Sequence, residues 1–85
     1  MSNLLKGKLE TIATYTISLD FDLVMAQSEY KLNLLRETLH KLGYVEEICF
    51  DHDCWITFQA SAKGEEQAFG RYETIAGIID SILQR

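Results

Sequence analysis

Residues 44–60 read YVEEICFDHDCWITFQA, and this stretch decides the fold because it predicts two short strands joined by a tight turn. Side chains of a strand alternate between its two faces, so the length of the turn fixes which residues share a face. Strands at Tyr44–Phe50 and Cys54–Ala60 leave a three-residue turn, Asp51–Asp53. A turn of two or four residues would place the apolar row of one strand beside the polar row of the other.

The expected register pairs Phe50 with Cys54 and Ile48 with Ile56, and it divides the hairpin into two faces. The inward face holds Tyr44, Ile48, Phe50, Cys54, Ile56, Phe58 and Ala60, interrupted by Glu46. The outward face holds Val45, Glu47, Cys49, Trp55, Thr57 and Gln59. A turn of this length usually needs one residue in the left-handed conformation, which aspartate tolerates better than most residues.

The turn itself raises the question of a metal or redox site, because FDHDCW follows Cys49 directly. A structural zinc site needs about four convergent ligands. The register sends Cys49 and Cys54 to opposite faces, and successive residues of a turn point apart. We therefore interpret the turn as a solvated polar corner and expect no firm metal site and no disulfide.

The rest of the chain supplies one more strand and two helices. The stretch LETIATYTISLDF, residues 9–21, alternates with a period of two and predicts a half-buried strand. A helix is expected from about Met25, since Leu32, Leu35, Leu39 and Leu42 recur at helical spacing, and Gly43 should end it in the left-handed conformation. Ser61 could cap a second helix, whose apolar stripe is Phe69, Tyr72, Ile75, Ile79 and Ile82.

The order strand, helix, strand, strand, helix predicts a single α+β domain over residues 1–85. We expect a two-layer sandwich, a truncated ferredoxin-like βαββα fold. Its sheet would have three mainly antiparallel strands and carry both helices on one face.

Composition narrows the classes of function. The chain has 85 residues and a formal charge of −5, and its eight basic residues are scattered, which disfavours RNA or DNA as a partner. No stretch reaches the ~20 apolar residues that a membrane span needs, so we expect no membrane association. The N-terminus lacks the long apolar segment of a secretory signal, which makes a cytoplasmic location with reduced cysteines the default expectation.

The outer face of the sheet is the first candidate binding surface. If both helices cover the inner face, a tryptophan is left on the bare side, and exposed aromatic residues of this kind anchor many protein interfaces. The candidate binding residues are Trp55, Val45, Cys49 and Thr57 from the hairpin, and Ile12, Thr14 and Thr16 from the first strand. The alternative is that the N-terminal segment, Met1–Lys8, folds over this face.

The first strand is the second candidate surface. In a split βαβ arrangement it normally lies in the middle of the sheet, beside a fourth strand that follows the second helix. The sequence ends at Arg85, directly after that helix, so the first strand would be an edge. Edges of this kind commonly pair across a symmetric dimer, and we expect a homodimer through this strand.

Asp20 and Asp22 are the candidate catalytic residues. At positions i and i+2 of a strand they would share a face, where two carboxylates could bind a divalent cation or transfer protons. The other interpretation is that one of them caps the following helix while the other is solvated.

Three segments resemble the small ferredoxin-like antitoxin family GhoS and, more distantly, the VapD toxins and the CRISPR-associated endonucleases of that fold. They are TYTISLD (Thr14–Asp20), LGY (Leu42–Tyr44) and WITFQASA (Trp55–Ala62), and the similarity covers about residues 13–65. In the toxin and CRISPR-associated relatives, an aspartate at the end of the first strand takes part in metal-assisted RNA cleavage. The resemblance therefore implies Asp20 as a metal ligand and catalytic residue.

Two hypotheses about function follow. The first is a small regulatory protein of antitoxin type that resembles GhoS-like endoribonucleases, in which a divalent cation would be the cofactor. The second is a non-enzymatic inhibitor from a phage or mobile element, of the anti-defence or anti-CRISPR type. Such an inhibitor needs no cofactor and would bind a host protein through the open sheet face and its acidic surface.

Overall fold

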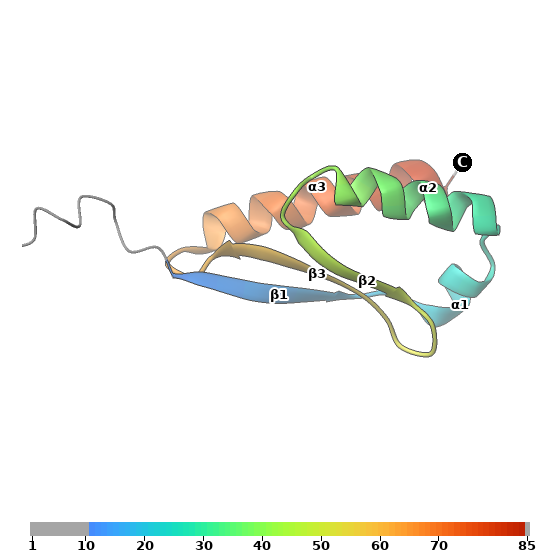
Figure 1. The fold of residues 1–85 in the computed structure, drawn as a ribbon, viewed down its shortest axis with the longest axis horizontal. Helices are drawn as coiled ribbons and strands as arrows, with labels where there is room; N and C mark the ends of the chain where they lie inside the picture. Colours follow the sequence, from blue (N-terminus) through green and yellow to red (C-terminus); the bar gives the residue numbers. More distant parts are fainter. Residues whose placement is uncertain (1–10, 85) are drawn as a thin grey trace, which may run out of the picture.

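The structure is a computed structural model that describes residues 11–84. Three strands form one antiparallel sheet in the order β1-β3-β2, and three helices accompany it. The elements are β1 (Ile12–Ser18), α1 (Phe21–Met25), α2 (Glu29–His40), β2 (Val45–Phe50), β3 (Cys54–Ser61) and α3 (Glu65–Leu83). Helices α2 and α3 lie side by side on one face of the sheet (Figure 1). The expected α+β fold with helices on one face is therefore confirmed.

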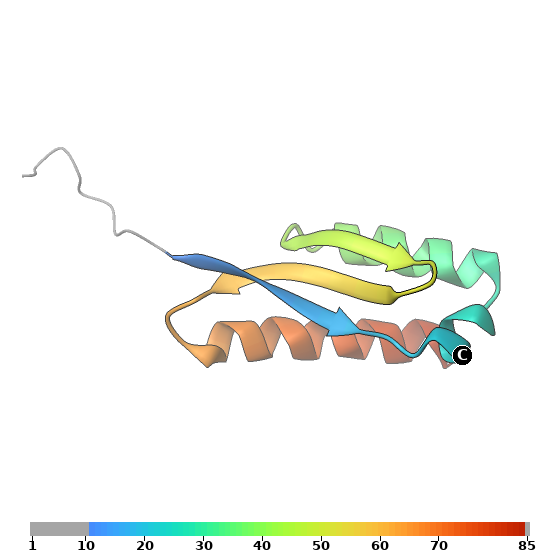
Figure 2. The same cartoon turned by 90° about the horizontal axis from the view of Figure 1, so that it is seen from below.

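The opposite face of the sheet carries no described helix. Seen from that side, the strands lie in front of α2 and α3, and the end of β1 lies in front of α3 (Figure 2). Strand β1 pairs only with β3 among the described residues, so it forms one edge of the sheet, as the chain order predicts.

The first strand ends earlier than its alternating pattern predicts. Ser18 is the last residue of β1, and the chain turns into the five-residue helix α1, which the sequence reading missed. Asp20 starts this helix, because its Oδ1 accepts hydrogen bonds from the backbone N–H groups of Asp22 at 2.8 Å and Leu23 at 3.3 Å. The alternating pattern of residues 9–21 predicts that the strand continues to Phe21. The helix cap formed by Asp20 ends the strand before that point.

The two long helices start and end by different means. Ser28 caps α2 by accepting a hydrogen bond from the N–H of Lys31, and Gly43 adopts the expected left-handed conformation, with φ +81°. The expectation that Ser61 caps α3 is wrong, because Ser61 is the last residue of β3 and Gly64 precedes the helix without a side-chain cap. Glu65 and Glu66 do lie in the first turn of α3, which suits the positive end of the helix dipole.

The hairpin register is confirmed near the turn and wrong at the far end. Phe50 pairs with Cys54 and Ile48 with Ile56, but a β-bulge between Val45 and Glu47 shifts the pairing by one residue. Val45 therefore lies opposite Phe58 and is buried in the core, so its assignment to the outward face is corrected.

The three-residue turn itself forms without any left-handed residue. None of Asp51, His52 and Asp53 has a positive φ angle, which overturns the expectation that an aspartate would supply one.

The core lies between the sheet and the two long helices. Its fully buried large side chains are Leu35, Leu39, Ile56, Ile75 and Val24. The rings of Tyr15 and Phe58 stack in this layer with centroids 5.5 Å apart. Arg71 closes one side, since its guanidinium lies 4.4 Å from the Tyr44 ring centroid and donates a 2.6 Å hydrogen bond to the Gln59 carbonyl.

The predicted apolar stripe of the last helix is only partly in this core. Ile75, Ile79 and Ile82 are buried, whereas Phe69 and Tyr72 keep 59% and 44% of their surface exposed. The N-terminal turns of α3 therefore extend past the edge of the three-stranded sheet.

Candidate functional site

The outer face of the sheet gathers most of the predicted binding residues around Trp55. Antiparallel pairing places Ser18 of β1 and Cys49 of β2 on either side of this tryptophan. Thr16 and Thr57 pair in the same way one step further along the sheet on this face. Trp55 is half-buried between these two neighbours. Ile12 stands 57% exposed at the far end of the face.

A hollow of about 370 Å³ lies beside Trp55. Its walls come from the end of β1, the start of α1 and the hairpin turn, and they include Thr16, Ser18, Phe21, His52, Asp53 and Trp55. Phe21 remains 43% exposed. Aromatic surface thus flanks a polar rim, an arrangement typical of an anchoring position in a protein interface.

A second feature of the outer face is a polar bridge across all three strands. Glu46 accepts a hydrogen bond from the Thr14 hydroxyl at 2.9 Å and one from the Gln59 amide at 3.2 Å. The bulge makes this bridge, because it turns Glu46 away from the core position that strict alternation assigns to it. The expected interruption of the apolar face by a carboxylate does not occur.

The edge of β1 exposes a defined set of backbone groups. The backbone N–H of Leu19 donates a hydrogen bond to the carbonyl oxygen of Cys54, and that of Ala62 donates one to the carbonyl oxygen of Thr11. The odd-numbered residues of β1 therefore exchange backbone hydrogen bonds with β3. The even-numbered residues then direct their N–H and C=O groups to the open side. These residues are Ile12, Thr14, Thr16 and Ser18.

A groove of about 710 Å³ runs along this open edge, between β1 and the first turns of α3. Tyr15, Ile17 and Phe58 supply apolar side chains on its sheet side, and Ala68, Phe69 and Tyr72 supply them on its helix side. The carboxylates Glu65 and Glu66, in the first turn of α3, also line the groove. The rings of Phe69 and Tyr72 stack with centroids 6.3 Å apart. Helical spacing predicts both residues in the core, but the sheet of residues 11–84 ends before it covers them.

The two candidate catalytic aspartates do not share a strand face. Asp20 is the cap of α1, and Asp22 lies in the first turn of that helix. Both are exposed, and the interpretation of Asp20 as a helix cap is confirmed. In the described part of the chain, no cluster of three or more histidine, cysteine, aspartate or glutamate side chains is placed to hold a metal ion.

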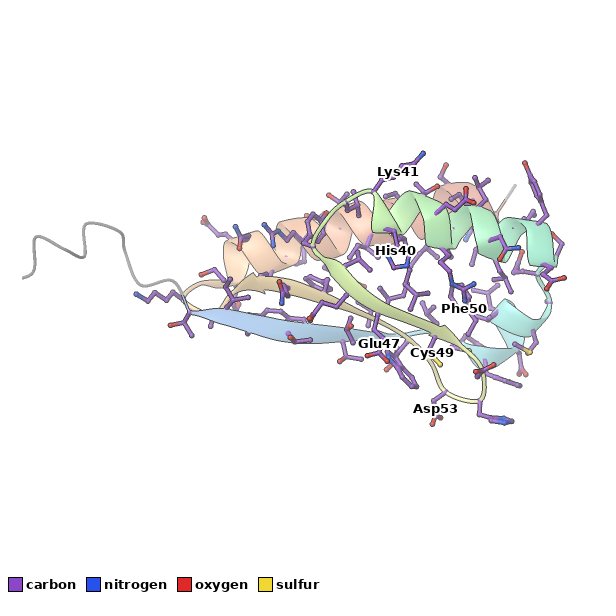
Figure 3. The ribbon with its side chains drawn as sticks, in the orientation of Figure 1. His40, Lys41, Glu47, Cys49, Phe50 and Asp53 are labelled. Carbon is purple, nitrogen blue, oxygen red and sulfur yellow. The ribbon has the colours of Figure 1, made fainter. Side chains whose placement is uncertain are left out.

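The structure separates the side chains of the hairpin turn that the sequence brings together as candidate metal ligands. Phe50 points from β2 toward α2, whereas Glu47 and Asp53 lie on the opposite side of the sheet (Figure 3). Both cysteines are free, with Cys54 buried and Cys49 half-buried on the outer face. Burial, reinforced by the neighbouring Cys49 and aspartates, raises the pKa of the Cys54 thiol, whose Sγ lies 3.3 Å from the Asp51 carbonyl oxygen.

Comparisons with family models, with characterised proteins and with solved structures found no match to this chain. The resemblance to GhoS and VapD therefore stays a prediction. Among the helices that the structure describes, none combines the length and the apolar character required to cross a membrane. The alternative interpretation, in which Met1–Lys8 covers the outer face, concerns residues outside the described range.

Proposed function

We propose that this protein is a small regulatory protein of the antitoxin or inhibitor kind that acts by binding another protein through the outer face of its sheet. The observation that carries the proposal is the placement of half-buried Trp55 beside a hollow, on a sheet face that no described helix covers. Large aromatic residues in partly enclosed positions supply much of the binding energy of protein interfaces.

Charge supports a protein partner with a basic surface. The chain carries a net charge of −5, and Glu46, Glu47 and Asp53 lie along or beside the outer face. Carboxylates repel phosphate groups and attract lysine and arginine side chains. The partner would therefore dock an apolar group at Trp55 and place basic residues at the rim.

We further propose that the protein works as a homodimer that forms through the open edge of β1. Strand edges that lack protection pair readily with a second strand, and a symmetric dimer satisfies both edges at once. This pairing leaves the outer face free for the partner, because the edge and the face use different groups of β1.

The test of partner binding compares three purified proteins as baits in extract from the native organism. Wild type and Tyr30→Ala should retain the same specific protein, since Tyr30 lies on α2 and is 75% exposed on the helical layer. Trp55→Ala should lose it. Measured affinity of the isolated partner for the three baits then decides the proposal, and equal binding by Trp55→Ala contradicts it.

A parallel assay addresses catalysis. Each protein is incubated with single-stranded RNA and magnesium or manganese, together with Asp20→Ala and Asp20→Ser. Serine keeps the helix cap but removes the carboxylate. Cleavage by wild type that both variants lose would replace the binding proposal with a nuclease. An inert wild type agrees with binding alone.

A further inference from the structure

Phe69 and Tyr72 occupy core positions in the helical pattern and yet are exposed in the described structure. They lie one helical turn apart on α3, and they continue the same apolar row as buried Ile75 and Ile79. Their exposed rings form one wall of the groove that runs beside β1. An apolar surface of this kind, continuous with the core, marks a place where another chain packs.

The edge of β1 offers the hydrogen bonds that such a chain would need. The backbone groups of Ile12, Thr14, Thr16 and Ser18 point to the open side. The strand contains no proline and no charged residue, and its pairing with β3 runs without a bulge from Ile12 to Ser18. Monomeric proteins commonly protect their edge strands with prolines, charged side chains or bulges. The described part of this edge has none of these three features.

The strand is also complementary to itself. A two-fold axis perpendicular to the sheet brings two copies of β1 together in antiparallel order and keeps both helical layers on the same side. Even-numbered residues then meet even-numbered residues, so that every open backbone group finds a partner. The inward-facing side chains that each strand contributes to the groove are Tyr15 and Ile17, which are uncharged.

We infer that the groove along β1 receives β1 of a second copy, with the two Tyr15 residues facing each other at the two-fold axis. This inference rests on the proposed homodimer and specifies its interface. Centring on Tyr15 pairs the whole strand Ile12–Ser18 with its counterpart, whereas a shift by two residues leaves backbone groups unpaired at both ends. Phe69 and Tyr72 of each copy then close over the paired strands.

The dimer changes the partner-binding surface as well. Two three-stranded sheets become one six-stranded sheet, whose outer face carries both Trp55 hollows. Thr14 of one copy lies opposite Thr16 of the other at its centre. A partner that binds this face would meet two equivalent anchoring positions, which raises its apparent affinity if it can engage both.

Substitutions at Thr16 provide the first test, with the oligomeric state of the full chain measured by analytical ultracentrifugation over a concentration series. Thr16→Pro removes an N–H that points to the open side and spares the ladder to β3, so it should weaken the dimer roughly tenfold or more. Thr16→Val keeps that N–H and should dimerise like wild type. Circular dichroism checks that each variant is folded.

A second pair of variants keeps the test decisive if Thr16→Pro does not fold. Phe69→Glu and Tyr72→Glu change exposed positions of α3 and leave β1 intact, so each should retain the fold and lose the dimer. A wild-type protein that stays monomeric at every concentration overturns both the homodimer and this interface. A purified wild-type protein that stays monomeric is the result expected if the groove receives a strand from a different protein instead of a second copy.

Cross-linking tests the register itself. In a Cys49→Ser background, Thr14→Cys mixed with Thr16→Cys should form a disulfide-linked dimer under oxidising conditions, because paired residues on neighbouring strands have Cα atoms about 5.5 Å apart. Either variant alone should cross-link far less. A dimer that survives Thr16→Pro and gives no mixed cross-link overturns the interface while leaving the homodimer standing. The Trp55→Ala binding test is independent of all these results.

Discussion

Val45 lies opposite Phe58 in the sheet, one residue out of step with the pairing of Glu47 and Thr57. The bulge at Glu46 produces this offset, and it places an apolar side chain in the core and a carboxylate on the outer face. The same feature therefore completes the core and builds the polar bridge to Thr14 and Gln59.

Replacing Val45 by alanine should consequently destabilise the fold. Removing a buried valine side chain of this size costs about 2 kcal/mol of unfolding free energy. Thr57→Ala, on the outer face, should cost much less. Urea unfolding followed by circular dichroism measures both. Equal small losses for the two variants would show that Val45 is not in the core.

Trp55 and Phe58 are three residues apart on β3 and belong to opposite faces of it. Phe58 is 2% exposed, so Phe58→Ala should cost about 3–5 kcal/mol of unfolding free energy, as is usual for aromatic residues in a core. Trp55→Ala should cost well under half of that, because the indole is already partly in contact with water. Thermal unfolding of the two variants provides the comparison. A larger loss for Trp55→Ala would assign the indole to the core instead of to a binding surface.

The two cysteines should differ in reactivity toward a thiol reagent at mildly alkaline pH. Burial raises the pKa of the Cys54 thiol, which keeps it protonated and slow to react, while half-buried Cys49 should be labelled first. Mass spectrometry after brief labelling distinguishes the two sites. Equal labelling of both in folded protein would contradict the buried position of Cys54.

The same shift predicts a dependence of stability on pH. At a pH above the ordinary pKa of a thiol, the unfolded chain releases the Cys54 proton while the folded chain keeps it. The free energy of unfolding therefore falls as the pH rises toward the pKa of Cys54 in the folded chain. At a pH below the ordinary thiol pKa, the stabilisation from the protonated Cys54 thiol is fully present. Cys54→Ala should show a smaller alkaline loss than wild type in urea unfolding at a series of pH values.

Asp20 should contribute to stability as a cap. Asp20→Ala leaves the N–H groups of Asp22 and Leu23 without their side-chain acceptor, at a cost of about 1 kcal/mol. Asp20→Ser should recover most of this, since a serine hydroxyl also accepts at the start of a helix. Urea unfolding of the two variants tests the role. Equal losses would indicate that the carboxylate charge matters more than the cap.

The sequence alone determined the class of fold and the pairing next to the turn. Period-two and helical spacing are local properties, and only an odd turn length keeps Ile48, Phe50, Cys54 and Ile56 on one buried face. The alternation of β1 likewise predicted its odd-numbered residues as the inner row.

The tertiary structure decided the rest, because burial depends on what lies across from a residue and not on its spacing. Helical spacing predicts Phe69 and Tyr72 in the core, but the sheet formed by the described residues ends at β1 and leaves them beside its open edge. Strict alternation assigns Val45 to the outer face, and a β-bulge places it in the core instead. The charged residue Glu46 in the expected inward row is the local signal of this bulge. Periodicity predicts which side chains of an element are apolar, whether or not a neighbouring element covers them. Only the arrangement of the chain in space shows which of these apolar side chains remain exposed.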